Sequence, residues 1–594
     1  MNKITKKICL VLILAIAGIA SASAQRIYAS ELESVATASG YDLTFTLNAA
    51  ATNVDVIINS TTSTDSFVIP FGAKPIGVNT VSVSSASAPN ITTGAYTWEV
   101  KATGAAITAA ANGDKWVKFT DETQNLLLNF YTAHGLAVDK SFESPYLGRL
   151  YVSSNYKTGT GGNGRTTSQG MYILDAALTD VTGQGDVPWT GGVSWFSGSF
   201  MSPERVQVGT DGLVYIGDAA NGGVYIMNPG QYDGTYTQIF GGTATSGMYQ
   251  DGSTTIGGLN YGLCISGAAD SLQMVTCDRY YGTGASSNPW SLIGGQYNIL
   301  SYDLGTSIPW TSDPSGVVLD AGAALNGGLS GAILNSSLLG NASGGINIVS
   351  DDRGGFFIAQ NRNHNTYDAT GANTSDAQNL PCLIHVSYTP AEFGNPASYE
   401  MDFNSGDPQW GIMGFMNGSN QTGMAVIDGG STLIFGHTST EYQIYNVDYS
   451  SGVPVLTLTD SINTPQTVGS AYSMDVDAAG NLYVLTTATT LAGYAPVTTD
   501  NTFTTPAPSS QVLNFIATGI VTPKAPQLQV YPNPVQDMAH ISGVAGIESV
   551  KLIDLSGRVV MNQKQTSADI DMSGVAAGTY ILFVNNTPVK ITKK

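Results

Sequence analysis

Apolar and polar residues alternate in short runs along most of the chain, and turn-forming residues separate the runs. The segment from Arg205 to Met227 reads "RVQVGTDGLVYIGDAANGGVYIM", which is three such runs broken by Gly, Asp and Asn. Alternation with a period of two predicts strands with one buried face, and these turn residues tolerate the backbone of tight turns. The pattern therefore predicts an all-β protein.

A unit of two strands, a turn rich in Asp, Gly or Ser between them, and a third strand recurs six times from His134 to Ala517. The first strands of the units read "HGLAVD", "ERVQVG", "YGLCIS", "GINIVS", "GMAVID" and "YSMDVD", and the last unit is expected to end with the strand "QVLNFIA". Small β units that each cover the next predict a β-propeller over residues 114–520. The propeller has six blades, or seven if Lys115–Tyr131 closes a further one. A row of β-sandwiches is the alternative.

The propeller units resemble NHL and SMP-30-type blades, whose first strand ends in Asp and whose second carries an apolar-Tyr-apolar run. This resemblance implies a fold and no particular activity. Ahead of the propeller, the strands "YDLTFTLN", "VDVIIN" and "GAYTWEVKATG" predict an Ig-like β domain at residues 25–113.

The N-terminus has the pattern of a secretory signal peptide. Three lysines precede an apolar run from Ile8 to Ala20, and Ala22-Ser23-Ala24 follows as a cleavage site. Residues 1–24 are therefore expected to be removed. The run is short for a membrane span, and no later stretch is long and apolar enough, so the mature chain is expected to have no transmembrane segment.

Charge and cysteine content narrow the function classes. The formal charge is −21, and only 11% of the residues are charged. An acidic chain without a basic cluster is not expected to bind nucleic acid. Cys264, Cys277 and Cys382 remain after the signal peptide, and Cys264 and Cys277 are expected either to form one bridge or to stay buried thiols.

The C-terminal residues 528–594 follow a linker at 521–527 and predict a separate small Ig-like β domain. The segment resembles the type A C-terminal sorting domain of the type IX secretion system of Bacteroidetes. The residues that carry the resemblance are Tyr531, Pro532, Asn533, Pro534, Gly557, Gly578, Tyr580 and Lys590. The resemblance implies export through the periplasm to the outer-membrane surface or the medium, with the secretion machinery and a sortase as partners.

The chain shows none of the familiar catalytic or phosphate-binding motifs. A propeller binds ligands most naturally at the mouth of its central channel, where the residues just before each first strand converge. These candidate ligand-binding residues are His134, Glu204, Asn260, Tyr261, Gln421 and Tyr472, with Asn420 beside Gln421. Glu204 is the best anionic ligand for a divalent cation, but its neighbours are mostly neutral. We therefore predict no cofactor, with a divalent cation in the channel as the alternative.

Tryptophans in the expected loops suggest a ligand class. Trp189, Trp290 and Trp310 each follow a proline, and Trp195 and Trp410 lie in similar stretches. Exposed tryptophans would stack on sugars, whereas buried ones would pack between blades. The sequence predicts an exported, non-enzymatic binding module for glycan or protein ligands. The alternative is a hydrolase, lactonase or lyase that acts in the central channel.

Overall fold

The computed structural model describes residues 25–594 with gaps, and its regular structure is almost entirely β-strand. The predicted signal peptide lies outside the described residues. So do residues 85–90, 110–114, 156–157, 162, 183–191, 197–201, 221–222, 241–248, 252–253, 257, 269–270, 281–296, 305–315, 321–345, 361–365, 368–372, 375–382, 389–398, 405–421, 439–440, 464–469, 487–489, 516–527, 544–545, 555–557, 565–566 and 586. In the part described, no helix has the length and hydropathy to cross a membrane.

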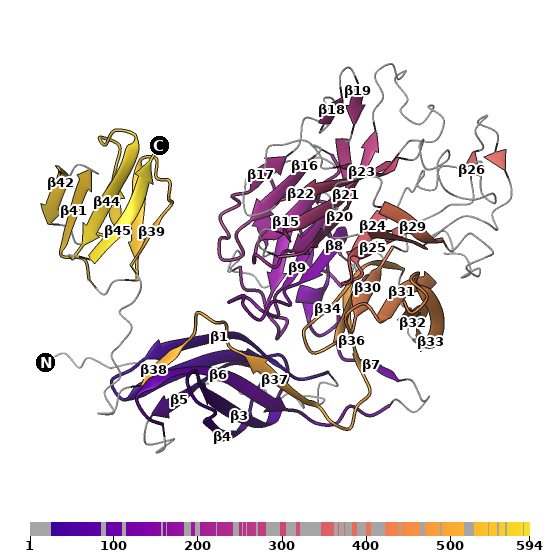
Figure 1. The fold of residues 1–594 in the computed structure, drawn as a ribbon, viewed down its shortest axis with the longest axis horizontal. Helices are drawn as coiled ribbons and strands as arrows, with labels where there is room; N and C mark the ends of the chain where they lie inside the picture. Colours follow the sequence, from indigo (N-terminus) through magenta and orange to yellow (C-terminus); the bar gives the residue numbers. More distant parts are fainter. Residues whose placement is uncertain are drawn as a thin grey trace, which may run out of the picture. The chain divides into compact units, whose positions relative to one another are not determined.

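The chain divides into two compact units. The first consists of residues 1–33, 43–81 and 96–512, and the second of residues 34–42, 82–95 and 513–594. Figure 1 shows both units and labels many of their strands.

Within the described residues, the first unit holds six four-stranded antiparallel sheets. The first three are β8 (Ala133–Val138), β9 (Leu150–Ser154), β12 (Gly170–Leu174) and β13 (Val193–Ser194); β14 (Arg205–Val208), β15 (Val214–Asp218), β16 (Gly223–Met227) and β17 (Thr237–Phe240); and β20 (Gly258–Ser266), β21 (Gln273–Tyr280), β22 (Tyr297–Asp303) and β23 (Gly316–Asp320). The others are β24 (Ile346–Ser350), β25 (Gly355–Gln360), β28 (Leu383–Tyr388) and β29 (Tyr399–Asn404); β30 (Met424–Ile427), β31 (Thr432–Thr438), β32 (Glu441–Asp448) and β33 (Val455–Asn463); and β34 (Ala471–Val476), β35 (Leu482–Thr486), β36 (Thr490–Pro496) and β7 (Trp116–Lys118).

The first strands of these sheets form a closed ring. They contact one another in the order β8, β14, β20, β24, β30 and β34, and β34 contacts β8 again. At this closure the backbone N–H of Val138 donates to the carboxylate of Asp475 at 2.7 Å. A ring of small sheets around an axis is a β-propeller, so the predicted fold class is confirmed.

A short strand from ahead of the ring completes the last sheet. In β7, Trp116 lies opposite Pro496 and Lys118 lies opposite Tyr494, both of β36. The segment Lys115–Tyr131 therefore adds its strand to this sheet and does not start a further one. Since β7 comes from before the first sheet, its pairing with the last sheet fastens the two ends of the ring together.

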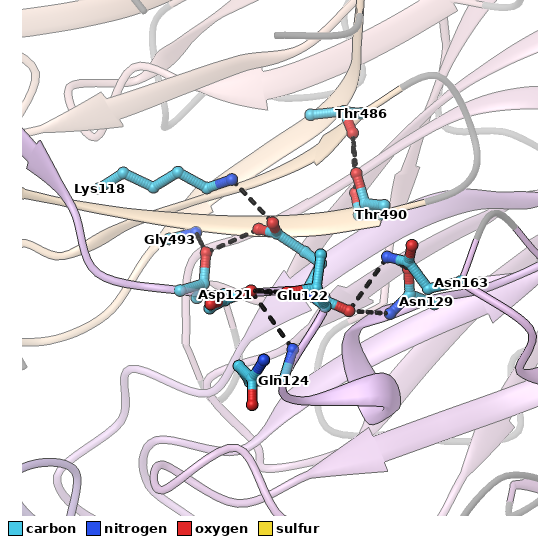
Figure 2. A network of polar contacts seen from close by, with 11 residues as sticks. Lys118, Asp121, Glu122, Gln124, Asn129, Asn163, Thr486, Thr490 and Gly493 are labelled. Atoms are coloured by element: carbon cyan, nitrogen blue, oxygen red, sulfur yellow. Dashed lines mark hydrogen bonds and ion pairs between the residues drawn. The ribbon is translucent and has the colours of Figure 1, made fainter. Parts of the chain in front are cut away.

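Polar contacts fix the segment that follows β7 (Figure 2). Thr120 accepts a hydrogen bond from the Gly493 backbone N–H at 2.9 Å, which ties the segment to β36. Lys118 pairs with the carboxylate of Glu122 at 2.7 Å. The backbone carbonyl of Glu122 accepts bonds from Asn129 and from Asn163, which lies between β9 and β12 of the first sheet. The segment is thus bonded to both the first and the last sheet.

The aspartates in the repeated turns are structural. One carboxylate oxygen of Asp351 accepts the backbone N–H groups of Arg353 and Gly355, both at 2.7 Å. Asp477 accepts those of Ala479 and Asn481 in the same way, at 3.0 and 2.9 Å. Because these oxygens satisfy donors that the tight turn leaves free, Asp at this position stabilises the first hairpin of the sheet.

After the ring the chain returns to the N-terminal region. There the strand order is β37 (Thr502–Pro506), β6 (Gly94–Thr103), β3 (Ala51–Ser60) and β4 (Ser66–Lys74). The expectation that Gln511–Ala517 gives the third strand of the last propeller unit is wrong, because that strand is β36. The two strands share an alternating pattern, and only the pairing separates them. The Ig-like class of this region and the limits of the domains stay predictions.

The C-terminal residues of the second unit form two small sheets with a core of their own. Their strand orders are β39 (Gln529–Tyr531), β40 (Met538–Ser542) and β43 (Asp569–Asp571), and β42 (Val559–Lys564), β41 (Ser549–Asp554), β44 (Gly578–Val584) and β45 (Thr587–Lys593). Val550, Leu552, Leu582 and Ile591 are among the fully buried side chains. The separate core explains why the sequence reads as a small domain.

One buried arginine joins four sheets across the ring. Arg205 begins β14, and its guanidinium donates to the carbonyl oxygens of His134 at 2.9 Å and Tyr472 at 3.3 Å. It also donates to the hydroxyl of Thr422 at 3.2 Å. His134 and Tyr472 lie in the first strands of the first and last sheets, and Thr422 lies two residues before β30 begins. Because its partners belong to sheets on other sides of the ring, the Arg205 side chain crosses the channel axis. The side chain is only 2% exposed, so these bonds lie in a dry environment.

We expect Arg205→Met to lower the free energy of unfolding of the propeller by about 3 kcal/mol, because three buried acceptors lose a charged donor. Lys115→Met is the control, since the Lys115 side chain is 69% exposed and its pair with Asp460 is a surface contact. Denaturant unfolding measures both variants. Equal midpoints for Arg205→Met and the control would show that Arg205 does not hold the ring.

A second buried charge cluster lies in the fourth sheet. His385 is fully buried, and its ring nitrogens contact Asp402 at 2.5 Å and Asp351 at 3.0 Å. Burial alone would lower the pKa of His385, but the hydrogen bonds and charges of the two carboxylates outweigh it and raise the pKa. Only the imidazolium can donate to both carboxylates at once.

This arrangement predicts a pH-dependent stability. The folded pKa of His385 is raised, so its contribution is complete below the unfolded pKa of about 6.5 and is lost as the pH rises through the folded value. We expect His385→Gln to cost about 3 kcal/mol of unfolding free energy at pH 6 and less at pH 9. His540→Gln is the control, because the His540 side chain is 40% exposed. An equal cost at both pH values would contradict the charged form.

Candidate functional site

Three of the predicted channel residues meet where the first strands begin. His134 Nδ1 lies 2.9 and 3.0 Å from the two carboxylate oxygens of Glu204. The ring of Tyr472 stacks on the His134 ring, with centroids 4.2 Å apart and an angle of 19° between the planes. We call His134, Glu204 and Tyr472, with Asn155 and Arg205, the entrance cluster. The first three are in contact, and their predicted role in ligand binding stays a prediction.

Charge in the entrance cluster is balanced internally. Burial alone would raise the pKa of Glu204, but His134, Arg205 and Asn155 outweigh it, and the pKa is lowered. Glu204 is therefore an ionised acceptor, and His134 donates to it in the tautomer that carries its hydrogen on Nδ1. The Asn155 amide donates to the same carboxylate at 2.5 Å. Glu204 is only 1% exposed, and its carboxylate oxygens bond to His134 and Asn155.

Sequence reasoning missed Asn155 and Arg205. Asn155 follows the second strand of the first sheet, whereas the predicted channel residues all come from the starts of first strands. Arg205 follows Glu204 and is the first residue of β14. The alternating pattern of the strand does not indicate that this arginine is buried and bonded to other sheets. Asn155 Oδ1 is buried without a hydrogen-bond partner in the described part of the chain. The one sequence signal for Asn155 is that it is a polar residue directly after a strand.

The remaining predicted channel residues are not placed by their side chains. Asn260 and Tyr261 lie in β20, where the backbone of Asn260 pairs with Asp278, and their side chains lie outside the described structure. Asn420 and Gln421 also lie outside the described residues. Among the residues that are described, no three His, Cys, Asp or Glu side chains gather to hold a metal ion.

Other predicted features have structural roles where they are described. Trp195 is 8% exposed, and its indole N–H donates to Ser202 at 2.7 Å while its ring packs on Tyr225 and Tyr236. Trp189, Trp290, Trp310 and Trp410 lie outside the described residues. Cys264 and Cys277 are buried free thiols, and burial raises the pKa of Cys264 to about 12. The bridge between them is thus ruled out, and Cys382 is not described.

The open space in the described propeller lies at the other end of the first strands. A cavity of 530 Å³, here called the end cavity, is lined by residues of all six sheets, among them Lys140, Gln207, Ile265, Val349, Val426 and Asp475. A hollow of 990 Å³, here called the side groove, shares Lys140, Asp352 and Val426 with it. Neither space could be predicted from the sequence, because both are made from the ends of strands far apart in the chain.

The sorting motif in the C-terminal domain pins the last strand. The Asn533 amide donates to the carbonyl of Lys590 at 3.2 Å, and its oxygen accepts the backbone N–H of Thr592 at 2.8 Å. Tyr580 donates to the carbonyl of Ala576 at 2.7 Å. Gly578 begins β44 and Tyr531 ends β39, whereas Gly557 lies outside the described residues. Pro532 and Pro534 flank Asn533 directly after β39.

The comparisons with known proteins bear on this C-terminal domain. No curated protein matches the chain. Among solved structures, PorZ of Porphyromonas gingivalis, an essential surface component of its type-IX secretion system, is 11% identical over 95% of this chain and 70% of its own, with a TM-score of 0.30. A gluconolactonase of Xanthomonas campestris is 11% identical over 66% and 94%, with a TM-score of 0.34.

A virginiamycin B lyase of Staphylococcus aureus is 8% identical over 64% of this chain and 99% of its own, with a TM-score of 0.29. Similarities at this level carry no argument about activity. Residues 529–594 match the family model of the secretion system C-terminal sorting domain. The chain therefore ends in a sorting domain of this family, which implies export to the cell surface or the extracellular space.

Proposed function

We propose that this protein is a non-enzymatic binding module, exported by the type IX system, that recognises a glycan or protein ligand outside the cell. The C-terminal sorting domain supports the export route through the periplasm, with the secretion machinery and a sortase as its partners. The propeller supplies a rigid body with long connections between strands, and such connections often carry binding residues.

The observation that carries the proposal is the closure of the entrance cluster. The Glu204 carboxylate is bonded to His134 and Asn155, and Arg205 is bonded to three backbone or hydroxyl acceptors. Acid–base catalysis requires a titratable group within reach of a substrate proton. Groups that are buried and paired with each other instead stabilise the ring.

A specific feature favours the enzyme alternative. A carboxylate that orients the Nδ1–H of an imidazole leaves Nε2 as a base, which is the arrangement of many hydrolases. His134 and Glu204 have this relation, and His134 is 8% exposed. A channel hydrolase, lactonase or lyase would therefore use His134 as its base, with Glu204 as the group that orients it.

A lactone assay separates the two functions. We expect the full chain to hydrolyse γ- and δ-lactones no faster than buffer and to carry less than stoichiometric calcium or zinc, because a single, already bonded carboxylate binds hard cations weakly. Glu204→Gln should then not change the rate. Turnover by the wild type that falls at least about 100-fold in Glu204→Gln, with Glu122→Gln unchanged, would establish the enzyme instead.

The export function is tested by deletion. We expect a chain without residues 525–594 to stay in the periplasm as a folded protein, because the sorting domain has its own core and is the address for export. Cell fractionation with limited proteolysis measures location and folding together. Delivery of the truncated chain to the surface would contradict the assignment.

A point variant sharpens this test. Asn533→Ala removes both bonds that hold β45 and should reduce the exported fraction several-fold, since each bond contributes about 1 kcal/mol to ordering the last strand. Asn562→Ala is the matched control, because Asn562 is exposed in β42 of the same domain. Equal export of the two variants would show that the motif is not read through this strand.

A further inference from the structure

The end cavity and the side groove adjoin each other within the first unit, and together they are called the hollow. Lys140, Asp352 and Val426 line both spaces, so the two spaces meet at these side chains. The side groove is bordered by Trp116 and by Arg26, which precedes β1 (Ala29–Ala36) and belongs to the N-terminal region. Ligand sites often occur at such junctions between domains, in volumes of about 300–1,000 Å³.

The N-terminal region is bonded to this end of the propeller. The backbone N–H of Arg26 donates to Asn481 at 2.7 Å, and Arg149 pairs with Glu31 at 2.6 Å. Asn501 holds the backbone of Ile27 at 2.9 Å. These contacts lie within one compact unit, so the border of the side groove is fixed by folding and does not require a ligand to form.

Some polar side chains that line the hollow have hydrogen-bonding capacity left over within the described part of the chain. The carboxylate of Asp352 and the amide of Gln207 make no hydrogen bond with any residue in the described part of the chain. Lys140 donates to Asp475 at 2.7 Å, and an ammonium has three donors. Spare donors and spare acceptors therefore lie side by side. This mixture suits hydroxyl groups, which donate and accept at the same time.

The charge of the lining excludes one ligand class. The carboxylates that line the two spaces are those of Asp139, Asp352, Asp428, Asp460, Asp475 and Asp477. The cations are those of Arg26, Lys115 and Lys140. Burial raises the pKa of Asp477 to about 6, but the carboxylates still outnumber the cations at neutral pH. A phosphorylated, sulfated or uronic acid ligand would be repelled.

The aromatic side chain of Phe142 lies in the side groove. It is 37% exposed and stacks on Phe503 with ring centroids 6.5 Å apart. A flat ring at the border of a polar groove can cover the apolar face of a sugar. The end cavity combines apolar side chains such as Ile265 and Val426 with hydroxyl, amide and carboxylate groups, and this mixture suits the apolar faces and the hydroxyl groups of a sugar.

We propose that the end cavity and the side groove bind a neutral saccharide chain, with one end in the cavity beside Gln207 and the adjoining units over Phe142. The inference rests on the proposed binding function and gives it a ligand class and a place. The site lies at the opposite end of the first strands from the entrance cluster.

Calorimetry of the full chain with neutral hexasaccharides tests the proposal, using the gluco-, manno- and xylo- series, with a hexasaccharide of galacturonic acid as the anionic probe. We expect at least one neutral probe to bind and the anionic probe not to bind. Gln207→Ala and Phe142→Ala should each weaken the Kd at least about tenfold. The matched controls Gln124→Ala and Phe196→Ala, on exposed residues elsewhere in the propeller, should leave it unchanged.

Thermal unfolding checks that the variants stay folded. Binding that survives both Gln207→Ala and Phe142→Ala, binding of the anionic probe alone, or no binding of any neutral probe would each overturn the inference. The proposed function fails on a different result, which is turnover in the lactone assay. The two failures can therefore be told apart.

Discussion

The charged contact that Arg205 makes across the channel axis is the constraint on which the entrance of the propeller depends. A guanidinium that is 2% exposed must find acceptors, and it finds them on the first and last sheets and next to the fifth. Its positive charge also helps to lower the pKa of Glu204. One side chain thus sets both the geometry and the ionisation of the entrance cluster.

The consequence for function is a division between the two ends of the first strands. At the entrance, Glu204, His134 and Arg205 bond to other protein groups, and these bonds hold the ring together. At the other end of the same strands lies the end cavity, where the side chains of Asp352 and Gln207 make no hydrogen bond within the described part of the chain. These two side chains therefore lie at the end of the propeller that is bonded to the N-terminal region.

Strand pairing between distant segments joins the N-terminal region to the propeller. A strand from before the ring completes the last sheet, and a strand from after the ring completes the N-terminal sheet. Each of these pairings joins segments nearly 400 residues apart, as Lys118 with Tyr494 and Thr103 with Thr502 show. The N-terminal region and the propeller therefore depend on each other for their strands. The sorting domain, in contrast, has a core of its own.

The sequence by itself determined the all-β class, the repeated unit and the sorting domain, because strand alternation, turn residues such as Asp351 and Asp477, and the Tyr531–Pro534 motif are local features. It also placed His134, Glu204 and Tyr472 together, since a repeated unit puts equivalent positions at one end of the ring. Only the tertiary structure decided which strand completes which sheet, that Arg205 crosses the axis, and where a cavity remains. Those properties depend on pairings between distant segments, and the pattern of a strand is the same whichever partner it finds.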